Sequence, residues 1–189
     1  MITPEKTTPT SKNRKYTVWL VAAVVLAIPL IVWSYPKDPP LGKTGAPGEG
    51  TCGDCHGGGS GGGNITVTSS AGKHYKPGVK QHLTVTISDP NASDWGYEMT
   101  AVQVSHSSTG AGAFKAVDSN SDVRKSGTKS YAAQINDFQG STNKVSYKID
   151  WTPPKKKVGK ITLYLAGVGG VGDPSFDSVY TGKLTLSPK

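Results

Sequence analysis

Two cysteines and a histidine form the densest cluster of chemically reactive residues in this chain of 189 residues. Cys52 and Cys55 are the only cysteines, two residues separate them, and His56 follows directly. This C-x-x-C-H pattern is typical of covalent attachment of c-type haem. Each thiol can form a thioether with a haem vinyl group, and the imidazole can then bind the iron as the proximal ligand. The sequence therefore predicts one covalent haem c held by Cys52, Cys55 and His56.

Other uses of a C-x-x-C pair fit the sequence less well. A structural zinc site needs four ligands, and there is no second C-x-x-C and no closely spaced pair of histidines. A redox C-x-x-C normally opens a helix in a strand–helix–strand setting, and the surrounding sequence has no such pattern. A simple disulfide between the two cysteines is the third alternative. Of these uses, the spacing favours haem.

The sixth ligand of the iron is left open by the sequence. Met99 would give His/Met ligation, but it shares strand parity with Trp95 and Tyr97 and so also fits core packing. His74 precedes a turn and is the nearest other histidine to the motif. His82 and His106 are weaker candidates, and an iron with no sixth ligand from the protein is the remaining alternative. Met99 and His74 are the two leading candidates.

The N-terminal region predicts export and a membrane anchor. Residues 1–15 are polar and basic, and residues 16–33 carry no charge. As a helix, this apolar run would rise about 27 Å, close to the ~30 Å hydrocarbon thickness of a bilayer. Basic residues ahead of it predict a cytoplasmic tail (1–15), a single transmembrane segment (16–34) and an extracytoplasmic remainder. The run exceeds the usual apolar region of a signal peptide, which favours an uncleaved anchor over a cleaved signal and a secreted protein.

A segment rich in proline and glycine (35–63) separates the apolar run from the rest of the chain. Its first part, through Gly50, contains four prolines and predicts a semi-rigid spacer that holds the haem motif off the lipid. Its last part, 57–63, has six glycines and one serine and predicts a mobile linker. The lack of side chains there would also let the backbone lie close against a porphyrin.

Residues 64–189 predict an all-β domain. Short runs of alternating apolar and polar residues are separated by glycine, proline, asparagine, aspartate and serine, and no strand–helix alternation appears. The predicted strands are 65–68, 81–87, 95–106, 113–117, 130–135, 144–151, 160–165 and 178–186. This spacing favours an antiparallel, immunoglobulin-like β-sandwich.

Two stretches together resemble a known arrangement. The haem-motif opening, 44–56, is similar to that of bacterial Reeler-like proteins, also called choice-of-anchor V domain proteins. The similarity continues at 75–78, 95–101, 151–154, 159–163 and 172–181, in the same order, and covers most of residues 44–185. The resemblance implies a Reelin-type β-sandwich with a c-type haem at its edge. Relatives often carry a histidine near the position of Gln134, so any haem role of that histidine is absent here or is taken by another residue.

The remaining features of the sequence exclude some classes of function and indicate no further binding or catalytic site. The formal net charge of +8 lies partly in the basic N-terminal stretch and gives no reason to expect nucleic-acid binding. Asp173 and Asp177 flank a short turn, but calcium would need a third carboxylate at loop spacing. No Ser-His-Asp or paired-carboxylate arrangement has supporting context, so we expect no enzymatic activity.

The sequence predicts a membrane-tethered monohaem c-type cytochrome that transfers electrons to a redox partner protein. Its main domain would lie on the periplasmic side of a bacterial cytoplasmic membrane, and the oligomeric state is not predicted. One alternative is a non-enzymatic, Reeler-like binding or adhesion module in which haem is structural or absent. The other is a haem sensor with an open iron position.

Overall fold

The computed structural model describes residues 38–59, 61–135 and 143–189. The predicted cytoplasmic tail and transmembrane segment lie outside these residues. Within the described part, no helix is both long enough and apolar enough to cross a membrane. The only helical elements there are two short 3₁₀ turns, η1 (Cys52–Asp54) and η2 (Pro174–Phe176).

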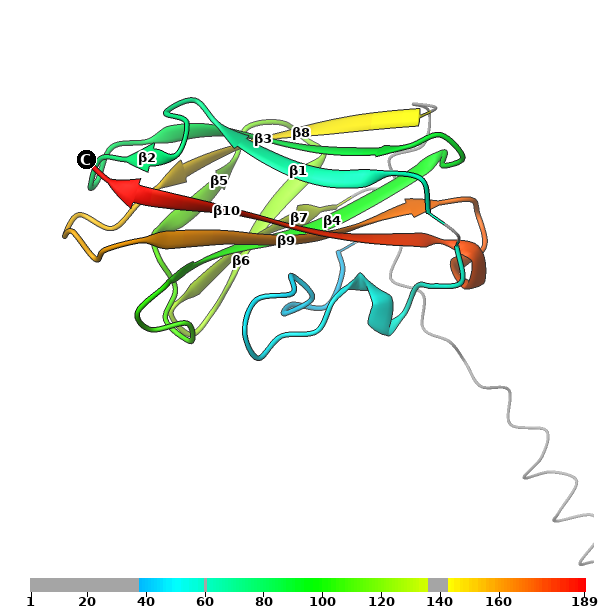
Figure 1. Ribbon diagram of the computed structural model, residues 1–189, viewed down its shortest axis with the longest axis horizontal. Helices are drawn as coiled ribbons and strands as arrows, with labels where there is room; N and C mark the ends of the chain where they lie inside the picture. The colour runs from blue at the N-terminus through cyan, green and yellow to red at the C-terminus, as the bar shows by residue number, and fades with distance from the viewer. Residues whose placement is uncertain (1–37, 60, 136–142) are drawn as a thin grey trace, which may run out of the picture. The chain divides into compact units, whose positions relative to one another are not determined.

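The described strands form two sheets that pack face to face (Figure 1). The four-stranded sheet has the order β1-β3-β8-β5, and its strands are β1 (Asn64–Ser69), β3 (Gln81–Asp89), β8 (Asn143–Thr152) and β5 (Ala113–Ala116). The six-stranded sheet has the order β2-β10-β9-β4-β7-β6, and its strands are β2 (His74–Tyr75), β10 (Ser178–Pro188), β9 (Ile161–Gly170), β4 (Asp94–Gln103), β7 (Lys129–Gln134) and β6 (Ser121–Ser126). All these pairings are antiparallel except that of β2 with β10. The predicted all-β sandwich is confirmed.

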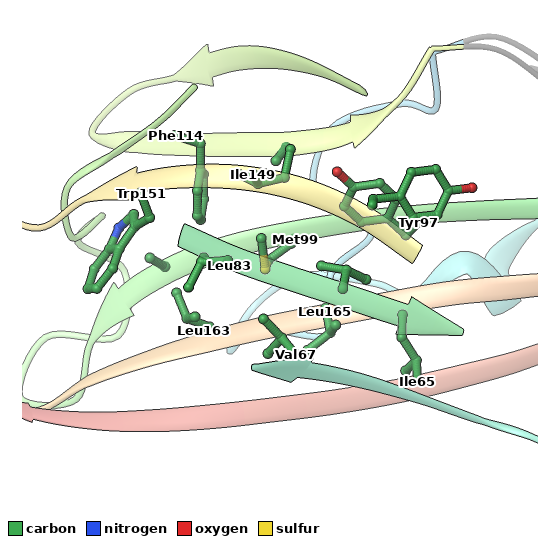
Figure 2. Close-up of a cluster of buried hydrophobic side chains, with 14 of the residues drawn as sticks. Ile65, Val67, Leu83, Tyr97, Met99, Phe114, Ile149, Trp151, Leu163 and Leu165 are labelled. Atoms are coloured by element: carbon green, nitrogen blue, oxygen red, sulfur yellow. The ribbon is translucent and has the colours of Figure 1, made fainter. Parts of the chain in front are cut away.

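The hydrophobic core lies between the two sheets and is built by alternate residues of their strands. In β4, the residues Trp95, Tyr97, Met99 and Ala101 all belong to the core cluster, as their shared parity predicts. Figure 2 shows Met99 among core side chains of both sheets, with its sulfur inside the cluster. No residue of 38–59 belongs to this cluster. The core of the sandwich is therefore complete without the haem-motif segment.

The segment 38–59 lies on the outer face of the six-stranded sheet, on the side away from β1 and β3 (Figure 1). The backbone N–H of Lys43 donates to Glu98 of β4, and the side chain of Glu49 accepts from Lys129 and Tyr131 of β7. Glu98 lies next to Met99 in the chain and so points to the opposite face of the sheet. The segment predicted as a semi-rigid spacer is held against the sheet over its described residues, because partly buried hydrogen bonds join it to β4 and β7.

The structure also corrects the strand prediction at three places. The sequence missed β6, whose six residues include only one apolar side chain, and β2, which is too short to show a pattern. The predicted strand 95–106 ends at Gln103, after which hydrogen bonds from His106 to Gln103 and from Thr109 to His106 form turns. The backbone after Gln103 therefore forms local turn hydrogen bonds in place of a continued strand.

Candidate functional site

The cysteine pair lies in a tight 3₁₀ turn. Thr51 caps this turn, because its Oγ1 accepts from the backbone N–H of Gly53 at 3.1 Å. The backbone N–H groups of Cys55 and His56 both donate to the carbonyl oxygen of Cys52, at 3.2 and 3.0 Å. Cys52 begins the turn and Cys55 caps its end, with His56 directly after it.

His56 is held by a carboxylate 121 residues away in the chain. Its Nδ1 lies 2.7 Å from Oδ2 of Asp177, whose other oxygen accepts from the backbone N–H of Val171 at 3.1 Å. The side chain of Asp177 is 8% exposed and that of His56 is 37% exposed. An ionised carboxylate only accepts, so Nδ1 must carry the proton. The lone pair of a neutral His56 is then on Nε2, the nitrogen that could bind a metal.

The glycines after His56 let the chain run against the loop that carries Asp177. The N–H of Gly57 donates to Pro174 and that of Gly59 to Asp177, at 3.1 and 3.2 Å. Gly58 has φ +83°, and a Cβ there would lie 2.0 Å from the carbonyl oxygen of Ser175. The described glycines of 57–63 are therefore not a mobile linker. They permit a close backbone approach that side chains would block.

Two carboxyl groups lie where the segment 38–59 meets the sheet, Glu49 on the segment and Glu98 on β4, and their surroundings differ. Glu49 is buried, and burial raises its pKa, but hydrogen bonds from Lys129, Thr44 and Tyr131 outweigh this effect and lower it. Glu98 is fully buried, and among the described residues its Oε1 has no hydrogen-bond partner. Burial raises the pKa of Glu98 to about 7, and the nearby charge of Glu49 adds to the effect. One carboxylate is fully paired and the other is not.

Both cysteines are free thiols, Cys52 half-buried and Cys55 exposed. Burial, and secondarily the charge of Glu98, raises the pKa of the Cys52 thiol to about 12. Redox-active C-x-x-C pairs depend on the opposite change, a lowered thiol pKa. The redox-dithiol alternative is therefore disfavoured. The described ranges contain no group of three or more histidine, cysteine, aspartate or glutamate side chains placed to hold a metal.

The structure does not bring any of the candidate sixth ligands to His56. Met99 lies in the core, on the other face of the sheet. His74 pairs with Ser187 near the end of β10, about 30 Å along the strand from its start beside Asp177. His106 follows the end of β4 that is remote from the Val171 loop. His82 lies on the four-stranded sheet, where its Nδ1 contacts Asp150 at 2.6 Å.

Two exposed apolar side chains lie on the loop that carries Asp177. Phe176, the residue before Asp177, is 63% exposed, and Val171 is 46% exposed. Both are among the few large apolar side chains of the described residues that are exposed. A porphyrin needs an apolar surface beside its iron ligand, so the residues present fit a surface-attached haem. Two thiols supply the attachment and one oriented imidazole supplies the ligand.

Asp177 is the residue of this site that sequence reasoning missed. The sequence pattern pairs it only with Asp173 across a short turn, and in the structure Asp173 caps η2 by accepting from the N–H of Ser175 at 2.9 Å. The spacing between His56 and Asp177 carries no local signal. Gln134, the residue in place of the relatives' histidine, is buried and its Oε1 accepts from the backbone N–H of Tyr97.

Comparisons with known proteins bear on the fold. No protein-family model and no curated protein matches the chain. The human F-spondin Reeler domain matches with 17% identity and a TM-score of 0.47, over 66% of this chain and 89% of that one. A second structure, the Reelin-N domain of F-spondin, matches with 18% identity and a TM-score of 0.45, over 67% and 86%. A cohesin module of a Clostridium perfringens family 33 glycoside hydrolase matches with 12% identity and a TM-score of 0.45, over 67% and 96%. These low scores carry no functional inference, and the fold class rests on the strand pairing.

Proposed function

We propose that this chain is a membrane-tethered monohaem c-type cytochrome that transfers electrons on the extracytoplasmic face of a bacterial membrane. One observation carries the proposal: the histidine of the C-x-x-C-H motif donates from Nδ1 to Asp177. A histidine that binds a metal typically donates its other ring N–H to a carboxylate, a carbonyl or water. The motif thus comes with the supporting contact that its proposed chemistry needs.

Each residue of the site has a part in this proposal. Cys52 and Cys55 would hold the haem through thioethers, and His56 would bind the iron through Nε2. A haem so held supplies a one-electron couple between ferrous and ferric iron. Phe176 and Val171 would border it with apolar surface. The protein's own task is to tether the group and to orient one imidazole.

The setting is part of the same proposal. The segment 16–34 would anchor the chain in the membrane, with the main domain on the periplasmic side, and a redox protein would be the partner. The sandwich would be of the Reeler type, with the haem segment on the outer face of its six-stranded sheet. No histidine or methionine of the described residues reaches His56, so the sixth ligand would come from elsewhere or be absent.

A haem assay tests the proposal directly. The full chain would be produced in a bacterium with the haem-attachment machinery and exported to the periplasm. We expect a c-type pyridine haemochrome spectrum and an intact mass that contains one haem. The double variant Cys52→Ala, Cys55→Ala should keep its β-sheet circular dichroism and lose the covalent haem. A colourless wild-type protein with the mass of the bare chain, or haem retained by the double variant on a denaturing gel, would contradict the proposal.

A second candidate is a non-enzymatic, Reeler-like binding module. The observation in its favour is that the core is complete without the haem segment, which takes no part in it. Such a sandwich needs no haem to fold and could bind a surface ligand with haem structural or absent. The colourless outcome above, with Cys52 and Cys55 joined as a disulfide, would favour this candidate.

A further inference from the structure

We infer that Asp177 is a positioning residue that fixes the tautomer of His56 and lowers the reduction potential of the haem. This inference rests on the proposed function, since it concerns how the chain prepares its histidine for iron. It begins from the two contacts of the Asp177 carboxylate. Oδ2 accepts from His56 Nδ1 at 2.7 Å, and Oδ1 accepts from the Val171 N–H at 3.1 Å.

These two contacts leave the carboxylate little freedom to turn. Its side chain is 8% exposed, and its own backbone carbonyl accepts from the N–H of Gly59. The residue is thus held by the backbone on both sides, from Val171 and from the glycines after His56. Of the ion pairs in the described residues, the one made by Asp177 is with His56 alone. No lysine or arginine shares its charge there, so that charge acts on the imidazole.

The chemistry of an amide shows why the carboxylate matters. Asparagine at position 177 would have one acceptor oxygen in place of two. If that oxygen kept the Val171 N–H, the amide NH₂ would face His56 and donate to Nδ1. The imidazole would then carry its proton on Nε2, which is the wrong tautomer for binding iron. If the amide turned over, the Val171 N–H would lose its acceptor instead.

The charge has an effect of its own. A hydrogen bond from the imidazole to a carboxylate raises the basicity of the ligand. A more basic ligand stabilises ferric over ferrous iron, because the ferric ion carries the higher charge. Asp177 should therefore lower the reduction potential below that given by a neutral partner. A carbonyl or amide oxygen in the same place would accept the hydrogen bond without adding a negative charge.

The test compares Asp177→Asn with Asp150→Asn in the full-length haem protein. Asp150 is a suitable control because it contacts His82 through the same atom, Nδ1, on the other sheet. We expect Asp177→Asn to raise the reduced-to-oxidised ratio at a fixed applied potential about tenfold, which is about 59 mV for a one-electron couple. Asp150→Asn should leave the ratio unchanged. Equal ratios in the two variants would overturn the inference.

Two further measurements separate a positioning role from a merely structural one. Asp177→Glu keeps the negative charge and should restore the lower potential at least in part, which a purely steric role would not predict. If Asp177→Asn does not fold, Asp177→Glu is compared with the wild type alone. A full tenfold rise of the reduced-to-oxidised ratio in Asp177→Glu would then count against the inference.

The tautomer of His56 can be read by ¹H–¹⁵N NMR in the full chain without haem, such as the double cysteine variant. We expect a proton on Nδ1 when Asp177 is present and its loss in Asp177→Asn. A proton on Nε2 in the presence of Asp177 would overturn the inference even if the protein binds haem. Failure of the haem assay with the expected tautomer intact would instead contradict the proposed function alone.

Discussion

Two histidine–aspartate pairs in this protein have nearly the same local geometry and very different surroundings. In each pair, Nδ1 of the histidine contacts one carboxylate oxygen, at 2.7 Å between His56 and Asp177 and at 2.6 Å between His82 and Asp150. The second pair lies directly across the β3–β8 ladder, where His82 and Asp150 are register partners. The first pair joins a glycine-rich loop to the loop before β10. Similar contacts therefore arise in two different ways.

The surroundings decide what each pair can do. Asp150 also accepts from Lys80 at 2.9 Å, and the side chain of His82 is 69% exposed. Asp177 accepts from the Val171 N–H where Asp150 accepts from a lysine, and His56 follows two free thiols. A histidine–aspartate contact is therefore not evidence of a metal ligand by itself. The two neighbouring thiols and the exposed apolar residues of the Asp177 loop distinguish His56, as a candidate ligand, from the ion cluster at His82.

The largest expected difference between the pairs is in haem ligation. His56→Ala should keep the haem on its thioethers but remove the proximal ligand, so the oxidised and reduced visible spectra should change. His82→Ala should leave both spectra as in the wild type. The pyridine haemochrome of each variant gives the haem content, so a spectral change can be separated from loss of haem. The comparison would be broken by a spectrum that responds to His82→Ala and not to His56→Ala.

The next largest effect concerns the buried Glu98 beneath the segment that carries His56. Burial raises its pKa from 4.5 to about 7. The unfolded chain therefore releases this proton at a lower pH than the folded protein does. Stability should fall by about 3 kcal/mol as the pH rises from about 4.5 to about 7, and then level off. Glu98→Gln should remove this decline in urea unfolding measured between pH 4 and pH 8.

Glu49→Gln is the matched control for Glu98→Gln, because hydrogen bonds lower the pKa of Glu49. The contribution of Glu49 should be present above pH 4.5 and lost as the pH falls further, so its removal should destabilise the protein at neutral pH. An unchanged pH profile in Glu98→Gln would show that the Glu98 carboxyl group is better solvated than its surroundings indicate.

A smaller effect should follow from breaking the loop contact that holds His56 near Asp177. Gly58→Ala places a Cβ against the Ser175 carbonyl at φ +83°, whereas a Cβ at Gly57 would have nothing within 4 Å. We expect Gly58→Ala to lower the opening free energy of this loop by roughly 1–3 kcal/mol. Hydrogen exchange at the Gly57 and Gly59 amides measures it. Equal protection in Gly57→Ala and Gly58→Ala would contradict the close approach.

The smallest effect is expected for the pair on the four-stranded sheet. Burial alone would raise the pKa of Asp150, but hydrogen bonds from Lys80 and His82 outweigh the effect of burial, so the pKa is lowered. Its stabilising contribution is then present above pH ~4 and disappears as the pH falls further. Because such pairs contribute little, Asp150→Asn should cost less than about 1 kcal/mol in urea unfolding at pH 7, and less in high salt. A decrease of several kcal/mol in the free energy of unfolding would contradict this expectation and show that the pair contributes strongly to stability.

Much of the fold was predictable because strand patterns are local. The parity of Trp95, Tyr97 and Met99 predicted a buried face of β4, and all three belong to the core. All eight predicted strands are present, although their ends shift by a few residues. The missed strand β6 is mostly polar and lies at the edge of its sheet, where one neighbour supplies the pairing.

The site was predictable only in its covalent part. The sequence by itself determined the C-x-x-C-H spacing, because a tight turn and adjacent residues are set over a few bonds. Tertiary structure decided the partner of His56, because Asp177 comes beside it only when the loop before β10 meets the glycines after the motif. It also decided that His74, His82, His106 and Met99 lie away from His56, on other strands or faces. Contacts over 121 residues depend on the packing of whole sheets, and no local spacing encodes them.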